Sequence, residues 1–162
     1  MKKTKGMIDV SSKRVTKRVA RARCVVKLNP GLVKKIKEKT LVKGDAFEQA
    51  RVAGIMAAKK TGEFIPLCHP LGLDHVGISF RTDKDSVTVE TSVISCGKTG
   101  VEMEALVAAS MAALTIYDLC KMYTKDIEIK DLVLLYKSGG KSGTWRKGEK
   151  TNHKFQITNN LQ

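Results

Sequence analysis

Apolar and polar residues form short, distinct patterns along the first half of the chain. Residues 19–28, VARARCVVKL, alternate and then become valine-rich, which predicts a β-strand. Residues 30–40 follow with apolar positions at helical spacing, and Asn29 is placed to cap this short helix. Residues 46–60, AFEQARVAGIMAAKK, carry small and apolar residues on one face behind Asp45. The pattern therefore predicts a strand and two helices, the second capped by Asp45.

The second half predicts a loop, three strands and a long helix. Residues 61–75 contain two prolines and two glycines, which favour a loop or extended segment. Two strands, 76–82 and 86–95, are separated by a short polar turn and are typical of a hairpin. A helix predicted over 99–123 is apolar on nearly all sides, and residues 127–137 predict a last strand.

The order of these elements predicts the fold class. Without the short helix the order is βαββαβ, which predicts an α+β, ferredoxin-like sandwich with an antiparallel sheet and helices on one face. A single domain is expected over residues 1–143, with 144–162 as a flexible tail that lacks a clear period. The second sheet face and the apolar long helix both need covering, so a homo-oligomer is expected.

Charge narrows the classes of partner. The 162 residues include 30 Lys+Arg against 16 Asp+Glu, a net charge of +14 that attracts polyanions. Aromatic residues make up only 5% of the chain, so stacking platforms for single-stranded nucleic acid are scarce. A basic nucleic-acid-binding α+β module stays open as an alternative to an enzyme with a phosphorylated substrate. The chain has no run of about 18 apolar residues and no apolar stretch after its basic start, so a cytoplasmic protein without a membrane span is expected.

The positions of the cysteines and glycines argue against a metal site and against a nucleotide-binding P-loop. The four cysteines are isolated, which favours buried thiols in a reducing compartment over a metal site. Two GKT- or GKS-containing stretches suggest a nucleotide-binding P-loop, but Ser92 and Leu135 stand where its first glycine is required.

The long helix carries charges that such an apolar helix does not need. Glu102 either completes a capping box with Thr99 or lies beside an anion site that includes Lys98. Glu104 points about 200° away from Glu102 around the helix. Asp118 returns to nearly the same face as Glu104, but about 21 Å further along the axis. Both carboxylates can share one site only if a partner subunit supplies one of them; otherwise they are solvated.

Three further patterns suggest chemistry. Asp118 and Lys121 are three residues apart and form either a surface ion pair or, in a dry setting, an acid and base with displaced pKa values. His69 stands between two prolines, which hold the chain around it in one direction. Residues 137–143, KSGGKSG, suit either a flexible turn or an oxyanion.

Together these stretches resemble a known family. KGDAFEQARVAGIMAAKKT, IPLCHPL, GKTGVEMEALVAASMAALTIYDLCK and LLYKSGGKSG, in this order, are similar to the MoaC family of cyclic pyranopterin monophosphate synthases, from Ile8 to Gly143. The resemblance implies a lyase of molybdenum cofactor biosynthesis. Its substrate is a GTP derivative already cyclised between ribose C3′ and purine C8, and pyrophosphate is released. It also implies a homohexamer, a trimer of dimers with active sites between subunits.

The resemblance also implies roles for individual positions. Asp118, Lys121 and Lys43 match catalytic positions, with Asp118 and Lys121 as candidate general base and acid. The positions that match substrate contacts are Leu67, Cys68, His69, Met103, Glu104, Arg18 and Lys137, and Lys141 of the glycine loop joins them as a candidate. No metal ligand or required cofactor is expected, although Mg²⁺ can accompany a triphosphate. All matched positions are filled, which disfavours a catalytically silent relative, and nucleic acid is not an expected partner.

Overall fold

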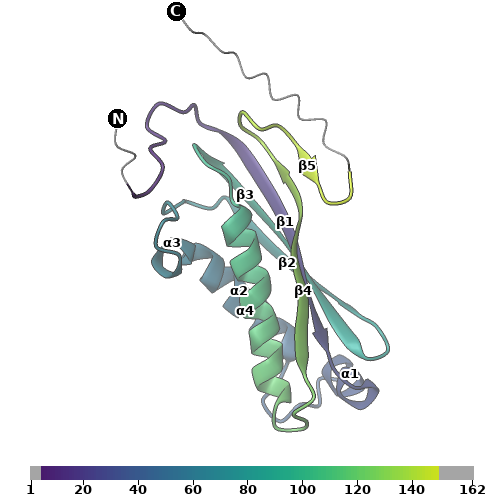
Figure 1. Cartoon of the computed structure of the whole chain (residues 1–162). Helices are drawn as coiled ribbons and strands as arrows, with labels where there is room; N and C mark the ends of the chain where they lie inside the picture. Colours follow the sequence, from purple (N-terminus) through teal and green to yellow (C-terminus); the bar gives the residue numbers. More distant parts are fainter. Residues whose placement is uncertain (1–4, 150–162) are drawn as a thin grey trace, which may run out of the picture.

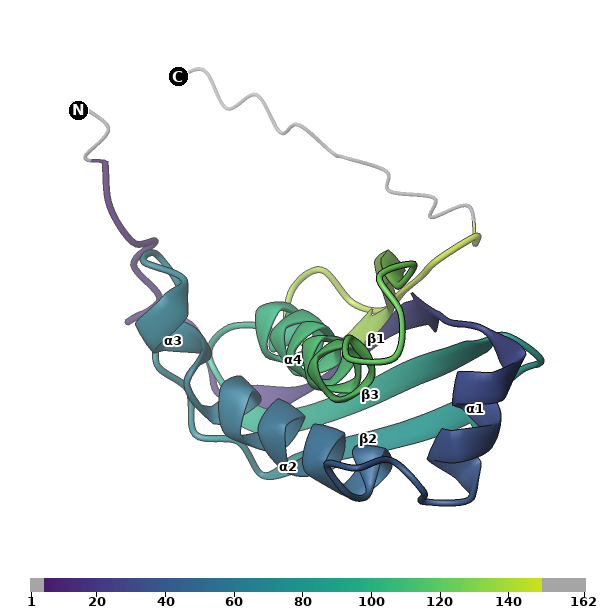
Figure 2. The same cartoon turned by 90° about the horizontal axis from the view of Figure 1, so that it is seen from below.

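One antiparallel sheet with helices packed against one face forms the core of the chain (Figures 1 and 2). The computed structural model describes residues 5–149. The helices are α1 (Pro30–Lys37), α2 (Ala46–Lys59), α3 (Thr61–Phe64) and α4 (Glu102–Cys120). The strands are β1 (Thr16–Lys27), β2 (His75–Thr82), β3 (Ser86–Gly97), β4 (Glu128–Ser138) and β5 (Trp145–Arg146), in the sheet order β2-β3-β1-β4-β5. The predicted α+β class is confirmed.

Strand β1 lies at the centre of the sheet and sets its packing. It pairs with β3 along its whole length and with β4 on its other side. Every second residue from Ala20 to Val26 is fully buried, as the two-residue period of a strand requires. These four side chains, Ala20, Ala22, Cys24 and Val26, form the floor on which α4 packs.

Helix α4 is the core helix of the domain. Its buried residues are Glu104, Ala105, Ala108, Ala109, Ala112, Ala113, Ile116, Leu119 and Cys120. The alanines let α2 approach closely: a Cβ on Gly54 would overlap Ile78 and lie 2.9 Å from the carbonyl oxygen of Ala108. By length and composition alone α4 could cross a membrane, although it contains no unbroken run of about 18 apolar residues. That is weak support for a membrane span, because core helices pass the same test and half of this window is buried.

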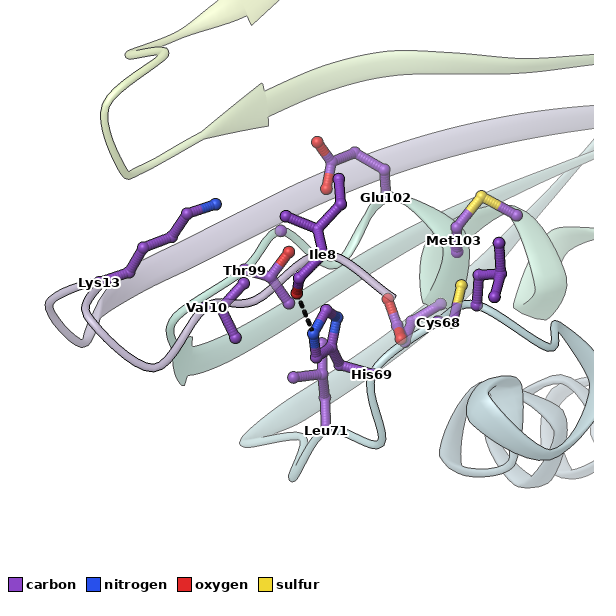
Figure 3. Close-up of a pocket in the computed structure, with 12 residues that line it drawn as sticks. Ile8, Val10, Lys13, Cys68, His69, Leu71, Thr99, Glu102 and Met103 are labelled. Atoms are coloured by element: carbon purple, nitrogen blue, oxygen red, sulfur yellow. Dashed lines mark hydrogen bonds between the residues drawn. The ribbon is translucent and has the colours of Figure 1, made fainter. Parts of the chain in front are cut away.

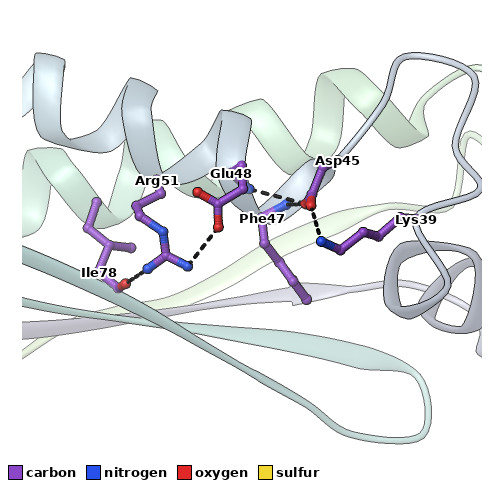
Figure 4. Close-up of polar contacts among 6 residues, drawn as sticks. All are labelled: Lys39, Asp45, Phe47, Glu48, Arg51 and Ile78. Atoms are coloured by element: carbon purple, nitrogen blue, oxygen red, sulfur yellow. Dashed lines mark hydrogen bonds and ion pairs between the residues drawn. The ribbon is translucent and has the colours of Figure 1, made fainter.

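Helix α2 is fixed at its start and along its length. Asp45 accepts hydrogen bonds from the first backbone N–H groups of the helix and pairs with Lys39 at 2.9 Å (Figure 4). Arg51 donates to the carbonyl oxygen of Ile78, which ties α2 to β2. The cap predicted at Asp45 is therefore confirmed.

Several element ends differ from the predictions. Helix α4 begins at Glu102, with Val101 as its N-cap residue and no side-chain cap, so the capping box of Thr99 with Glu102 is wrong. Glu102 instead pairs with Lys137, which is 35 residues away in the sequence. Its carboxylate is therefore turned toward Lys137 and does not cap the start of α4. The segment predicted as a loop contains the one-turn helix α3, because Thr61 is buried and its hydroxyl bonds back to the end of α2.

The sheet also has five strands, one more than the four predicted. Trp145 and Arg146 form β5, which pairs with Lys137 and Tyr136 of β4. Arg21 and Arg146 both lie over the ring of Tyr136, at 5.7 and 5.0 Å from its centroid. The start of the predicted tail therefore joins the sheet, while residues 150–162 lie outside the described residues. The ferredoxin-like assignment stays a prediction.

Candidate active site

A cleft in two compartments lies at the N-terminal end of α4. The main compartment, a cavity of about 260 Å³, is lined by residues 67–69, the first turn of α4 and part of the N-terminal segment (Figure 3). The basic compartment, about 170 Å³, is lined by Lys13, Arg18, Lys98 and Lys137 together with hydroxyls and backbone. Residues lining both are Lys13, Thr99, Gly100 and Glu102, so the two compartments adjoin.

Glu104 is the buried acid of the main compartment. The residue is only 4% exposed, and burial, with a smaller effect of the Glu102 charge, raises its pKa above 4.5. No other residue in the described part of the chain donates a hydrogen bond to its side chain. A carboxyl group of this kind exchanges a proton closer to neutral pH than an ordinary glutamate, which suits a general acid or base.

His69 and Cys68 line the cleft beside Glu104. The Nε2 atom of His69 lies 2.9 Å from the carbonyl oxygen of Ile8. A carbonyl oxygen can only accept, so Nε2 carries the hydrogen and Nδ1 is the acceptor in the neutral ring. Burial, and then the nearby charge of Glu104, raises the pKa of the Cys68 thiol. Cys68 is therefore a thiol and not a thiolate at neutral pH.

Arg18 holds together the two loops that form the basic compartment. Its guanidinium donates to the carbonyl oxygens of Gly97, Lys98 and Gly139 at 3.4, 3.3 and 3.2 Å. Gly140 has a φ of +72°, and a Cβ there would overlap the guanidinium. The glycine loop after β4 therefore needs its glycines both for its backbone conformation and for the space that Arg18 occupies.

A second charged group lies at the opposite end of α4. Asp118 accepts from Lys121 at 2.7 Å and from Lys43 at 2.8 Å. The hydrogen bonds from Lys121 and Lys43 lower the pKa of Asp118 to about 2, and the bond to Asp118 raises the pKa of Lys121. The Asp118 side chain is 50% exposed, so within the single chain the structure supports the surface ion pair and not the dry setting that was its alternative. The pairing therefore stabilises the charged forms of both groups.

A sequence profile of the MoaC family matches residues 7–140. The chain belongs to the MoaC family. It is 49% identical over 142 residues to the cyclic pyranopterin monophosphate synthase of Nitratidesulfovibrio vulgaris, which covers 86% of this chain and 88% of that protein. It is 50% identical over 145 residues to the synthase of Geotalea uraniireducens (88% and 91%) and over 142 residues to synthase 1 of Mycobacterium tuberculosis (87% and 84%). The resemblance seen in the motifs is confirmed, and this MoaC family member is an enzyme.

The positions matched to MoaC motifs fall into two groups in the structure. Those at the cleft are Leu67, Cys68, His69, Met103, Glu104, Arg18 and Lys137. Lys43, Asp118 and Lys121 form the other group, at the far end of α4. Fourteen residues separate Glu104 from Asp118, about 21 Å along the helix, so one chain does not bring the groups together. Lys141 is exposed and lines neither compartment.

Some residues of the cleft did not stand out in the sequence. Ile8, Val10 and Lys13 come from the N-terminal segment, whose lysines looked like ordinary solvated charges. Glu102 was considered as a cap and not as the partner of Lys137. The resemblance beginning near residue 8 was the one signal that the N-terminal segment belongs to the functional part of the chain. Within residues 5–149, no group of three or more His, Cys, Asp or Glu side chains is arranged to hold a metal ion.

Proposed function

We propose that this protein is a cyclic pyranopterin monophosphate synthase, a lyase of molybdenum cofactor biosynthesis that acts on 3′,8-cyclised GTP and releases pyrophosphate. Family membership supports the reaction. The observation that carries the proposal is the pairing of a buried carboxylate in one compartment with four cations around the next. A substrate with a heterocycle at one end and a triphosphate at the other needs both environments.

The basic compartment suits the phosphate end of this substrate. Closing the cyclic phosphate forms a bond from a sugar hydroxyl oxygen to the α-phosphorus and breaks the bond from that phosphorus to the pyrophosphate oxygen. The departing pyrophosphate takes up negative charge, which positioned ammonium and guanidinium groups stabilise. Lys98 and Lys137 line this compartment, and the Arg18 contacts keep its two loops in place. No resident cofactor is needed for this step, and Mg²⁺ would enter with the triphosphate.

The main compartment suits the ring rearrangement, which needs proton transfers at several atoms. Glu104 has the raised pKa expected of a group that takes and returns a proton. The Nδ1 atom of His69 is available as a hydrogen-bond acceptor. Met103, which is 37% exposed, provides an apolar contact at the start of α4.

We infer that a second subunit completes each site with its own Asp118, Lys121 and Lys43. At about 21 Å from Glu104 in one chain, these residues reach the same substrate only across an interface. Large apolar side chains exposed on the helical side of the domain support such an interface: Val52, Met56, Met103 and Leu114. The homohexamer, a trimer of dimers, is part of this proposal, as is a cytoplasmic location.

Mixing two inactive variants tests the shared site. Asp118→Asn removes the charge of one group and Glu104→Gln that of the other, and each homo-oligomer should form no product. In re-assembled 1:1 mixtures, half of the dimers pair unlike chains and carry one intact site of two, so about a quarter of wild-type turnover should return. Pyrophosphate and pterin should appear together. If a correctly assembled mixture shows no activity, Asp118 and Glu104 act within the same chain's site. That result would refute the shared arrangement.

The wild-type reaction tests the synthase itself. Purified oligomer should convert 3′,8-cyclised GTP with equal yields of pterin and pyrophosphate. If a folded oligomer forms neither product, the synthase proposal fails. Salt-dependent binding of oligonucleotides, measured on the same preparation, would then decide whether the +14 charge serves nucleic acid instead.

A further inference from the structure

The N-terminal segment crosses the mouth of the cleft. Ile8 and Val10 line the main compartment, and Lys13 lines both compartments (Figure 3). The carbonyl oxygen of Ile8 meets the His69 ring, while Lys98 donates to the carbonyl oxygen of Ser11 at 2.8 Å. His69 and Lys98, the two side chains that hold this segment, also line the cleft.

A tight turn within the segment directs Lys13. The backbone N–H of Ser11 donates to Asp9 Oδ1 at 2.8 Å, and that of Lys13 donates to the carbonyl oxygen of Val10 at 3.1 Å. The turn brings the Lys13 side chain round so that it extends toward the side of the cleft where Glu102 lies (Figure 3). Ile8 remains 73% exposed, so a large apolar side chain stands at the cleft with little of its surface buried by the chain itself.

Lys13 differs from the other three cations of the basic compartment in its contacts. Arg18 donates to three backbone carbonyls, Lys137 pairs with Glu102, and Lys98 donates to the N-terminal segment. Among residues 5–149, the Lys13 ammonium has neither an ion-pair partner nor a hydrogen-bond acceptor. An incoming phosphate can therefore bind Lys13 without breaking an existing contact.

We propose that residues 8–13 form a strap over the cleft and that Lys13, at the end of the strap, binds a phosphate group of the substrate. The strap covers the heterocycle with Ile8 and Val10 and brings Lys13 to the junction of the compartments. Lys13 is thereby a further substrate-binding residue, and Asp9 is a positioning residue that acts through the turn. The identity of the substrate rests on the synthase proposal, whereas phosphate binding at Lys13 does not.

The test compares Lys13→Met with Lys84→Met, which removes the same charge from the exposed β2–β3 turn. Lys13→Met should raise KM for cyclised GTP about tenfold or more, since it removes a charge-assisted hydrogen bond, and should change kcat much less. The Kd for inorganic pyrophosphate, measured by calorimetry on the intact oligomer, should rise similarly. Lys13→Arg should restore most of the affinity, and Lys84→Met should behave as wild type.

Wild-type KM and pyrophosphate affinity in Lys13→Met would overturn the proposal. So would equal effects of Lys84→Met, or a wild-type protein that does not bind pyrophosphate. If the wild type binds pyrophosphate but does not turn over cyclised GTP, the synthase proposal fails while the Kd comparison still decides the role of Lys13.

The role of the strap is tested by a double-mutant cycle. Asp9→Ala releases the turn and should weaken pyrophosphate binding in the wild-type background, because Lys13 is then less well placed. In the Lys13→Met background the same change should have little further effect. Fully additive effects would show that Asp9 does not act through Lys13 and would overturn the strap as a positioning device.

Discussion

Replacing Glu104 by glutamine should make the protein more stable at neutral pH and should abolish its turnover. The carboxylate is buried at the start of α4, and no other residue in the described part of the chain donates a hydrogen bond to it. Keeping an ionised group in such a place lowers the free energy of unfolding. Glutamine has nearly the same shape and carries no charge, so it removes this cost while leaving the packing of α4 unchanged.

The size and pH dependence of the gain follow from the environment of Glu104. Among the described residues the carboxylate has only the hydrogen bond from its own backbone N–H to offset its burial. Incomplete hydrogen bonding of a buried polar group costs about 1–3 kcal/mol, and the amide retains part of that cost, so a gain of about 1 kcal/mol is expected. In a chain of this length, that gain corresponds to a rise in Tm of about 2–4 °C. Because folding raises the pKa of Glu104 above 4.5, the wild type loses stability as pH rises through the raised pKa. The gain should therefore be full at pH 8 and should vanish below about pH 4.5.

Thermal unfolding of the purified protein between pH 4 and pH 8 measures this difference. Glu102→Gln is the matched control, because its carboxylate lies only two residues away but pairs with Lys137 at 2.8 Å. That variant should be slightly less stable than the wild type, opposite in sign to Glu104→Gln. A lower Tm for Glu104→Gln at pH 8, or a gain that persists below pH 4.5, would refute the reasoning about its burial. Full turnover by this variant would refute its role in proton transfer.

Four further predictions test other contacts. Asp118→Asn should fold and assemble with little change in Tm, because half-exposed ion pairs contribute little, but turnover assays should detect no product. Since pairing lowers the Asp118 pKa to about 2, its ion pairs should persist at pH 4 and be lost only on acidification toward pH 2; an NMR titration that finds an ordinary carboxyl pKa would contradict the pairing. Gly54→Ala should lower stability by about 1–3 kcal/mol in denaturant titrations, since α2 must move away from α4, whereas Gly72→Ala, which meets no atom within 4 Å, should not. Gly140→Ala should lower Tm and, by displacing Arg18, raise KM in steady-state kinetics; wild-type values for both would show that the Arg18 contacts to the loop are dispensable.

The elements that depend on local patterns were the most predictable from the sequence. The period of two in β1 and the cap at Asp45 are set by residues close together in the chain, and both are confirmed. The capping box was wrong because Lys137, distant in sequence, takes the Glu102 carboxylate. Strand β5 was missed for a related reason: two residues carry no period, and only pairing with β4 makes them a strand.

The candidate site was predictable in its members but not in its arrangement. Family motifs identified residues 67–69 and the first turn of α4, which line one compartment in the structure. No local pattern separates Lys13 from the other 29 lysines and arginines, since its position depends on a turn crossing a cleft made by distant segments. The environment of Asp118 was left open between two alternatives, because apolar residues lie on nearly all sides of this helix and burial depends on which side faces the sheet.

The distribution of charge along α4 explains why so apolar a helix carries charged side chains at all. Glu102 and Glu104 lie in its first turn, where the helix dipole favours carboxylates. Asp118 lies in its last turn, where the dipole disfavours a carboxylate, and a helix selected for stability alone would carry a cation there. Lys43 and Lys121 offset this cost by direct pairing. Between the two ends the helix is uncharged and packs on the sheet, so one rigid element holds two charged groups about 21 Å apart. Such an arrangement gives no advantage to a site within one chain, and it therefore supports the proposal that each α4 contributes one end to each of two sites in a symmetric dimer.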